Sequence, residues 1–262
     1  MRKILTIAGS DCSGGAGIQA DLKTITAHKM YGMSAITALT AQNTTGVYDI
    51  MNVSPEFLEQ QLVCIFEDIV PDAVKIGMIS NDGLLQVIIR NLIKYQAKNI
   101  VLDPVMISTS GRKLLDDIAY ERVLQELLPM VDMVTPNIPE IVAMTGIAIT
   151  SHEDMENAAR KLSQITQAAI LVKGGHFDGQ ADDLLFYEDQ SYLIYGERIH
   201  NSNTHGTGCT LSSAIACNLA NGHTMLDSVI LAKEYLAGAI RDGLDLGKGN
   251  GPLNHCYRIH EL

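Results

Sequence analysis

The segment Ile4-Leu5-Thr6-Ile7-Ala8-Gly9-Ser10-Asp11-Cys12-Ser13-Gly14-Gly15 begins with a short apolar run and ends in a glycine-rich loop. Ile18, Leu22 and Ile25 then recur at helical spacing, so the opening of the chain predicts a strand, a loop and a helix. Strands that alternate with helices are typical of a mostly parallel sheet with helices on both faces. The alternation continues, with further strands predicted at 73–76, 99–102, 130–135 and 168–172.

This pattern predicts the α/β class. No linker, low-complexity segment or internal repeat interrupts it, so we expect one domain over residues 1–262. We also expect a helix at 116–128, and an extended flap after a turn at 43–46.

Charge and cysteine content limit the possible functions. The net charge of −11 argues against a nucleic-acid partner. Five cysteines without a Cys-x-x-Cys pair argue against structural zinc and a disulfide framework, and reduced thiols indicate the cytoplasm. The apolar run at 4–8 is too short for a signal peptide, and no run is long enough to span a bilayer, so we expect no membrane role.

A second segment, Asn203-Thr204-His205-Gly206-Thr207-Gly208-Cys209-Thr210, reads as a loop that leads into a helix. Glycines allow close approach of a ligand, and the start of a helix offers unpaired N–H groups with partial positive charge. The segment therefore predicts a site for a phosphate or a developing negative charge, in which Cys209 would be favoured as a thiolate. The alternative is a tight turn with a small buried cysteine.

Ligands of open α/β sheets bind at the carboxyl ends of the strands. Here polar, glycine and methionine residues follow the predicted strands at Gly9, Gln42, Met78, Asp103, Asn137 and Lys173. We therefore expect the site at that edge of the sheet, although turn residues are also ordinary components of such loops.

Several of these residues have two interpretations. Glu140, three residues after Asn137, could hold Mg²⁺ or be a surface acid next to a helix cap. Asp103 could be a second carboxylate near the metal or a turn former. Lys173 could reach into the site or mark the exit of its strand to solvent, and Asp21 could be a solvated acid of the first helix.

The opening glycine loop does not fit two common nucleotide-binding motifs. Its spacing differs from Gly-x-Gly-x-x-Gly, and it lacks the Gly-Lys-Ser/Thr end of a Walker loop. This argues against a dinucleotide-binding fold. His176 and His205 could act as bases, but a single histidine in a loop is more often structural.

Residues 8–23 resemble the opening signature of the hydroxymethylpyrimidine/phosphomethylpyrimidine kinases, which are thiamine-biosynthesis enzymes of the ribokinase-like superfamily. The resemblance extends in order over essentially the whole chain, so it is specific. The further matching motifs are Thr40-Ala41-Gln42-Asn43-Thr44, Lys75-Ile76-Gly77-Met78, Asp103-Pro104-Val105-Met106, Thr135-Pro136-Asn137, Lys173-Gly174-Gly175-His176 and residues 203–210.

The resemblance implies a three-layer α/β/α sandwich, ATP and Mg²⁺ as cofactors, and two successive phosphorylations of one pyrimidine. It implies that Gly9, Asp21, Gln42, Met78 and Val105 surround the pyrimidine. It implies that Asn137, Lys173 and Asn203 bind the nucleotide, that Glu140 and Asp103 lie at the metal, and that Gly206, Thr207, Gly208 and Cys209 form the catalytic anion hole. We expect a homodimer, which the sequence does not establish.

One block departs from the family pattern, because Ser108-Thr109-Ser110-Gly111 stands where many relatives have Ala-Lys-Ser-Gly. A phosphate contact from a lysine is therefore in doubt, and Arg112 could replace it. The first rival function is a pyridoxal kinase of the same fold. Gln42 favours a pyrimidine, because its amide both donates and accepts hydrogen bonds. A second rival is a nucleotide-binding sensor without turnover, against which Glu140, Lys173 and Cys209 together argue.

Overall fold

The computed structural model describes residues 1–106, 116–175 and 181–259. Within these ranges nine strands form one sheet in the order β3-β2-β1-β4-β5-β6-β7-β8-β9. The strands are β1 (Lys3–Asp11), β2 (Tyr31–Asn43), β3 (Gly46–Asn52), β4 (Ala73–Ile76), β5 (Ile100–Leu102), β6 (Met133–Val134), β7 (Ala169–Val172), β8 (Asp183–Tyr187) and β9 (Gln190–Ile194).

In the order of the sheet, the strands β2, β1, β4, β5, β6 and β7 each pair in parallel with the next. The pairs β2–β3, β7–β8 and β8–β9 are antiparallel and lie at the two sides of the sheet. The prediction of a mostly parallel sheet is therefore confirmed.

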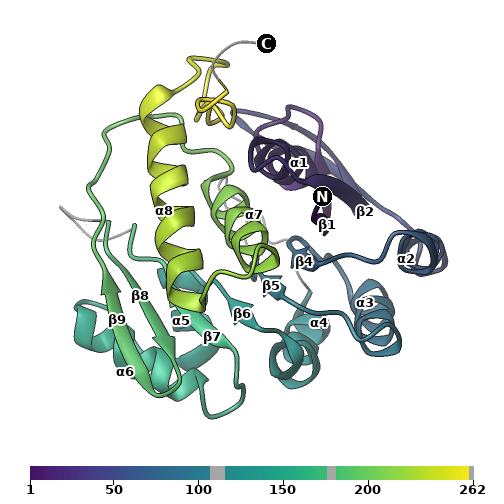
Figure 1. The fold of residues 1–262 in the computed structure, drawn as a ribbon, viewed down its shortest axis with the longest axis horizontal. Coiled ribbons are helices and arrows are strands. Elements are labelled where there is room, and N and C mark those ends of the chain that lie inside the picture. The colour runs from purple at the N-terminus through teal and green to yellow at the C-terminus, as the bar shows by residue number, and fades with distance from the viewer. Residues whose placement is uncertain (107–115, 176–180, 260–262) are drawn as a thin grey trace.

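Helices cover both faces of the sheet (Figure 1). One face packs against α2 to α6, and the other against α1, α7 and α8, which gives the predicted three layers. The helices are α1 (Gly17–Ala27), α2 (Pro55–Asp68), α3 (Asp82–Lys94), α4 (Asp117–Arg122), α5 (Ile138–Thr145), α6 (His152–Leu162), α7 (Thr207–Ala220) and α8 (Met225–Asp242).

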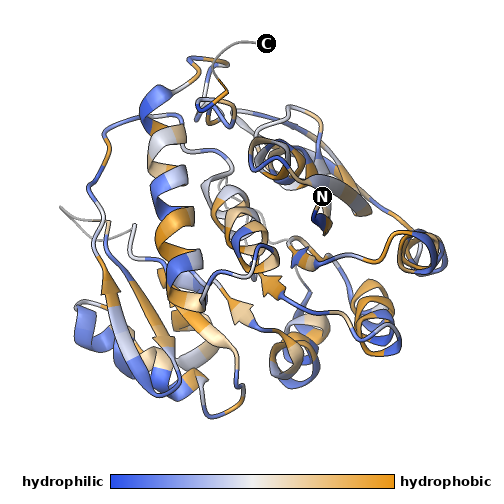
Figure 2. Ribbon diagram, viewed as in Figure 1, coloured by the Kyte–Doolittle hydropathy of each residue, from blue (hydrophilic) through white to orange (hydrophobic). Residues whose placement is uncertain are grey.

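Alternate residues of the central strands supply the two cores, because successive side chains of a strand point to opposite faces. Leu5 and Ile7 of β1 face the core under α2 to α6, and Ile4 faces the core under α7 and α8. Figure 2 shows hydrophobic residues along the central strands and more polar residues on the outer helices such as α6. The sheet is thus buried on both sides, as expected for parallel strands.

The helix predicted at 116–128 differs from the observed structure. The α-helix α4 ends at Arg122, and the chain continues as a π-helical turn (Val123–Leu127) and a 3₁₀ turn (Leu128–Met130). Pro129 lies in this last turn. Proline has no N–H and its ring clashes with the carbonyl four residues earlier, here that of Gln125, so the turn that precedes Pro129 departs from regular α-helical geometry.

The predicted flap is formed by β2 and β3, with Asn43 paired to Gly46 across the turn. Its tip is tied to the segment after α8, because Thr44 Oγ1 accepts hydrogen bonds from the backbone N–H groups of Lys248 and Gly249, both at 3.1 Å. In the part of the chain that the structure describes, no helix combines the length and apolar character needed to cross a membrane.

Candidate active site

The carboxyl ends of the parallel strands open into a cavity of about 1420 Å³. Parallel strands bring their carboxyl ends to one edge of a sheet, so residues far apart in the sequence meet there. The predicted site residues that line the cavity are Gly9, Gln42, Met78, Asp103, Val105, Asn137, Glu140, Lys173, Gly206, Thr207, Gly208 and Cys209.

The N-terminus of α7 points its first N–H groups toward this cavity. Gly206 is the N-cap, in the left-handed conformation with φ of 88°. A Cβ atom at this position would lie 1.9 Å from the carbonyl oxygen of Gly15, so only glycine fits. The first turn of α7 contains no acidic residue. The Thr207 N–H donates to the carbonyl oxygen of Thr204 at 3.4 Å, so the N–H groups of Gly208 and Cys209 offer the anion-binding end of this helix.

Lys173 places a cation beside this helix end. Its Nζ lies 3.0 Å from Asp103 Oδ1, and a Cβ atom on Gly208 would lie 3.5 Å from the same Nζ. Burial lowers the pKa of Lys173, but the carboxylates of Asp103 and Glu140 outweigh that effect and raise it. Lys173 therefore stays charged within reach of an anion at the N-terminus of α7.

Asn137 and Glu140 form a capping box at the start of α5. The Glu140 N–H donates to Asn137 Oδ1 at 2.9 Å, and the Asn137 N–H donates to Glu140 Oε2 at 2.8 Å. Both residues also line the cavity, and Glu140 is buried, so it is not a surface acid. A role of Glu140 at Mg²⁺ stays a prediction. Burial raises the pKa of Glu140 to about 7, with Lys173 opposing and Asp103 adding to the rise.

The expectation that Cys209 is a thiolate is wrong for this structure. Burial raises the pKa of the Cys209 thiol to about 11; the positive charge of Lys75 opposes this rise, and Asp21 and Asp103 add to it. Burial and the two neighbouring carboxylates therefore outweigh the positive charge of Lys75 at this sulfur. At neutral pH Cys209 is a thiol on the wall of the cavity.

The expected position of Asp21 in contact with a pyrimidine also needs correction. Asp21 is fully buried and does not line the cavity. Its Oδ2 accepts hydrogen bonds from Thr6 Oγ1 at 2.6 Å and Lys75 Nζ at 2.9 Å, and its Oδ1 accepts one from Ser213 Oγ at 2.8 Å. Both carboxylate oxygens are thus occupied within the core. The alternative of a solvated acid is wrong as well.

Asn203 is likewise buried and lies outside the lining of the cavity. Its N–H donates to Asn201 Oδ1 at 2.9 Å, so its observed role is within the loop that leads to α7. The structure therefore does not bring it to the predicted nucleotide side. The described residues do not include His176 or the block that departs from the family pattern, which is Ser108, Thr109, Ser110, Gly111 and Arg112.

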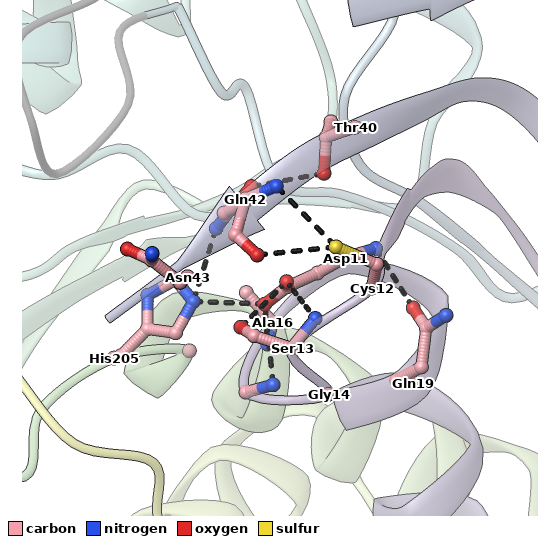
Figure 3. A network of polar contacts seen from close by, with 12 residues as sticks. Asp11, Cys12, Ser13, Gly14, Ala16, Gln19, Thr40, Gln42, Asn43 and His205 are labelled. Atoms are coloured by element: carbon pink, nitrogen blue, oxygen red, sulfur yellow. Dashed lines mark hydrogen bonds and ion pairs between the residues drawn. The ribbon is translucent and has the colours of Figure 1, made fainter. Parts of the chain in front are cut away.

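A polar network not predicted from the sequence joins the two glycine-containing segments (Figure 3). Asp11 Oδ1 accepts hydrogen bonds from the N–H and Oγ of Ser13 at 2.8 and 2.7 Å, and Asp11 Oδ2 accepts one from the Ala16 N–H at 2.9 Å. His205 Nε2 lies 2.8 Å from Asp11 Oδ2. Burial raises the pKa of Asp11, but the hydrogen bonds from His205, Ser13 and Ala16 prevail and lower it to about 2.

Sequence reasoning does not find this network, because His205 lies 194 positions from Asp11 and a single histidine in a loop is more often structural. The only signal was the position of Asp11 at the end of the first strand, next to glycines. The contact between His205 and Gln42, with 3.1 Å between His205 Nε2 and Gln42 Nε2, connects the network to the cavity.

Comparison with known proteins identifies the family. Residues 11–254 match the phosphomethylpyrimidine kinase family. The hydroxymethylpyrimidine/phosphomethylpyrimidine kinase of Rhizobium meliloti is 47% identical over 258 residues, which cover 97% of each chain. The thiamine biosynthesis bifunctional protein of Geobacter sulfurreducens is 45% identical over 260 residues; the match covers 99% of this chain and 53% of that protein.

Solved structures agree with this assignment. The phosphomethylpyrimidine kinase of Clostridium difficile 630 has a TM-score of 0.82 and 45% identity, covering 92% of this chain and 100% of that one. The Bacillus subtilis pyridoxal kinase in its ADP complex has a TM-score of 0.92 and 32% identity, covering 100% of both chains. With a match over nearly its full length, this chain belongs to the hydroxymethylpyrimidine/phosphomethylpyrimidine kinase family and is a kinase with a ribokinase-like α/β fold.

Proposed function

We propose that this protein transfers the γ-phosphoryl group of ATP to 4-amino-5-hydroxymethyl-2-methylpyrimidine, and then phosphorylates the monophosphate, in thiamine diphosphate biosynthesis. The observation that carries the proposal is that one cavity contains both the anion-binding end of α7 beside Lys173 and the amide of Gln42. The first suits a transferring phosphoryl group, and the second suits the polar edge of an aminopyrimidine.

Phosphoryl transfer depends mainly on positioning and on stabilising charge in the transition state. The N–H groups of Gly208 and Cys209 and the ammonium group of Lys173 suit the oxygens of the transferring group. The hydroxymethyl oxygen forms the new bond to phosphorus as the bond to ADP breaks, and the hydroxyl proton passes to solvent. The protonated thiol of Cys209 can orient that hydroxyl group, whereas accepting its proton would require the thiolate, which the raised pKa of the thiol disfavours.

We propose Mg²⁺ as the accompanying ion. Outside segments 107–115, 176–180 and 260–262, no group of three or more His, Cys, Asp or Glu residues is arranged to hold a metal. The residues present fit an ion that binds mostly phosphate oxygens and water, with Glu140 and Asp103 as its carboxylates. Burial raises the pKa of Glu140 and the charge of Asp103 adds to the rise, so the two carboxylates interact, and a bound cation would stabilise the ionised form of both. Mg²⁺ would neutralise charge on the phosphates.

The test is a kinase assay of the purified protein with Mg²⁺-ATP and the pyrimidine. We expect ADP and the pyrimidine monophosphate, and loss of product on chelation of Mg²⁺. A folded protein that gives no product above background would refute the proposal. Incubation of the enzyme with ATP and purified monophosphate, followed by phosphorus NMR, tests the second phosphorylation. If no diphosphate forms, the enzyme catalyses only the first phosphorylation.

Pyridoxal kinase is the second candidate function. The overall similarity to the pyridoxal kinase structure from Bacillus subtilis favours it, because that fold matches over the full length of both chains. Pyridoxal assayed beside the pyrimidine separates the two candidates. If kcat/KM were higher for pyridoxal than for the pyrimidine, pyridoxal would be the principal acceptor.

We further propose a homodimer formed through the flap of β2 and β3, in one ribokinase-like domain over residues 1–262. Leu39 and Met51 are cross-strand partners with exposed fractions of 40% and 63%, on the edge pair of the sheet. Exposed apolar side chains on an edge strand favour association with another surface. Analytical ultracentrifugation of wild type and Leu39→Glu tests it, since the variant should sediment as a monomer. Five free cysteines support the cytoplasm as the compartment.

A further inference from the structure

Gln42 lies between two side chains that restrict the orientation of its amide (Figure 3). His205 Nε2 lies 3.1 Å from the amide nitrogen of Gln42, and Thr40 Oγ1 lies 3.1 Å from the amide oxygen. A 180° rotation of the amide about its last bond fills the same volume and exchanges these two atoms. Only hydrogen bonding therefore distinguishes the two orientations.

The His205 side requires an acceptor from Gln42. Asp11 is ionised at neutral pH, since its pKa is about 2, so its oxygens only accept hydrogen bonds. His205 Nε2, 2.8 Å from Asp11 Oδ2, must therefore carry a proton. This holds both for the neutral ring with its proton on Nε2 and for the charged ring. The ring nitrogen carries only this one proton, which Asp11 Oδ2 and a Gln42 oxygen would share, whereas an N–H of Gln42 facing it would place two donors together.

The Thr40 side requires a donor from Gln42. Thr40 Oγ1 carries one hydrogen, and it lies 3.0 Å from the backbone carbonyl oxygen of Ser10, which only accepts. When the hydroxyl group donates to Ser10, its lone pairs remain for Gln42. The group of Gln42 that faces Thr40 is then the NH₂ group. Both neighbours are satisfied by the same orientation, with the Gln42 oxygen toward His205.

We infer that His205, held by Asp11, is a positioning residue that fixes the Gln42 amide with its oxygen toward His205 and its NH₂ group toward Thr40, and thereby determines which acceptor ring the kinase selects. This inference rests on the proposed function. The remaining N–H and oxygen lone pair of Gln42 then meet the substrate in a fixed order. The Gln42 N–H can donate to a ring nitrogen, and the Gln42 oxygen can accept from an exocyclic amino group next to it. A ring without the amino group can form only the first of these hydrogen bonds.

Steady-state kinetics of His205→Leu and His205→Gln test the inference. His205→Leu removes the donor; we expect the pyrimidine KM to rise about tenfold, as for the loss of one hydrogen bond that orients a ligand. The KM for ATP should stay unchanged, and the ratio of kcat/KM for pyrimidine over pyridoxal should fall. His205→Gln retains an Nε2 donor and should recover most of the wild-type pyrimidine KM.

A double-mutant cycle shows whether His205 acts through Gln42. His205→Leu should add nothing to the pyrimidine KM of Gln42→Leu, because the amide that it orients is already absent. Independent, multiplying effects would overturn the inference. Ser13→Ala is the matched control: it removes a hydrogen bond to the other oxygen of Asp11 and should leave the KM values unchanged.

A measurement on the wild-type protein avoids any folding defect of the variants. In ¹⁵N-edited NOE spectra, with the Gln42 side chain assigned by its loss in Gln42→Leu, its amide protons should show contacts to Thr40. Contacts to the His205 ring instead would reject the proposed orientation. A wild-type protein without kinase activity would refute the proposed function, whereas the NOE pattern would still decide the orientation.

Discussion

Lys75 Nζ on β4 lies 2.9 Å from Asp21 Oδ2 on α1, and both side chains are completely shielded from solvent. Asp21 also accepts hydrogen bonds from Thr6 and Ser213, so this pair joins β1, β4, α1 and α7. Burial lowers the pKa of Lys75, but the charge of Asp21, aided by that of Asp103, raises it well above its ordinary value. Burial also raises the pKa of Asp21, and the charge of Lys75 opposes that rise, so each side chain stabilises the charged form of the other.

Lys75→Met should destabilise the protein by about 3–5 kcal/mol, because it leaves the Asp21 carboxylate buried without its cation. The free energy of unfolding in urea measures the effect. The double variant Lys75→Met/Asp21→Leu should cost less than the sum of the single changes, since no unpaired charge remains. Arg2→Ala is the control, because it breaks an exposed ion pair with Asp72 and should cost at most about 1 kcal/mol. If Lys75→Met lowered the free energy of unfolding by less than about 1 kcal/mol, the buried pair would contribute little to stability.

Glu140 should make stability depend on pH. Burial raises its pKa from 4.5 to about 7, so its contribution is fully present below pH 4.5 and is lost as the pH rises through 7. Glu140→Gln keeps a side chain that can complete the capping box but cannot ionise. The Tm of the variant relative to wild type should therefore be higher at pH 8.5 than at pH 5. Glu140→Gln should also need more Mg²⁺ than wild type for half-maximal activity. An equal Tm difference between variant and wild type at both pH values would contradict the raised pKa of Glu140.

The Cys209 thiol should alkylate slowly at neutral pH. Because burial raises its pKa to about 11, the reactive thiolate fraction should keep increasing as the pH approaches that value. Mass spectrometry of the iodoacetamide-labelled peptide, with the exposed Cys64 as internal reference, gives the rate at each pH. A rate that levels off below pH 8 would mean that the helix end does stabilise the thiolate.

Cys209→Ala should lose most turnover and keep its affinity for ATP. Removal of a group that accepts or orients the acceptor proton typically lowers rates by about 10²–10⁴-fold. Single-turnover kinetics and ATP titration measure the two quantities separately. If Cys209→Ala turned over at the wild-type rate, Cys209 would have no part in catalysis and would only pack in α7.

Gln42→Leu should raise the KM for the pyrimidine, because the polar edge of the ring loses its partners. An unpaired polar group in a binding site costs about 1–3 kcal/mol, which corresponds to roughly 5–150-fold. Gln61→Leu is the matched control: Gln61 bonds the backbone of Ile36 in the fold and should affect stability rather than KM. Unchanged binding of the pyrimidine by Gln42→Leu would place Gln42 outside the pocket.

The sequence by itself determined the layered α/β fold and the family. Apolar periodicity is a local property, so the strand of Ile4 and the helix of Ile18 could be predicted without any long-range contact. The position of residues such as Gln42, Asp103 and Lys173 after strands also determined the edge of the sheet at which they meet, because parallel strands share one direction. The helix predicted at 116–128 ends next to Pro129, but the sequence pattern did not reveal that the turns before the proline leave α-helical geometry.

Only the tertiary structure decided the state and partners of the ionisable side chains. Asp21 looked like a solvated acid or a ligand contact, and packing placed it in the core against Lys75. Cys209 lies at a helix start, as predicted, yet its burial raises the pKa of the thiol and favours the protonated form. His205 meets Asp11 across 194 positions of sequence. Burial and contacts of this range arise when the layers assemble, and no local pattern of residues encodes them.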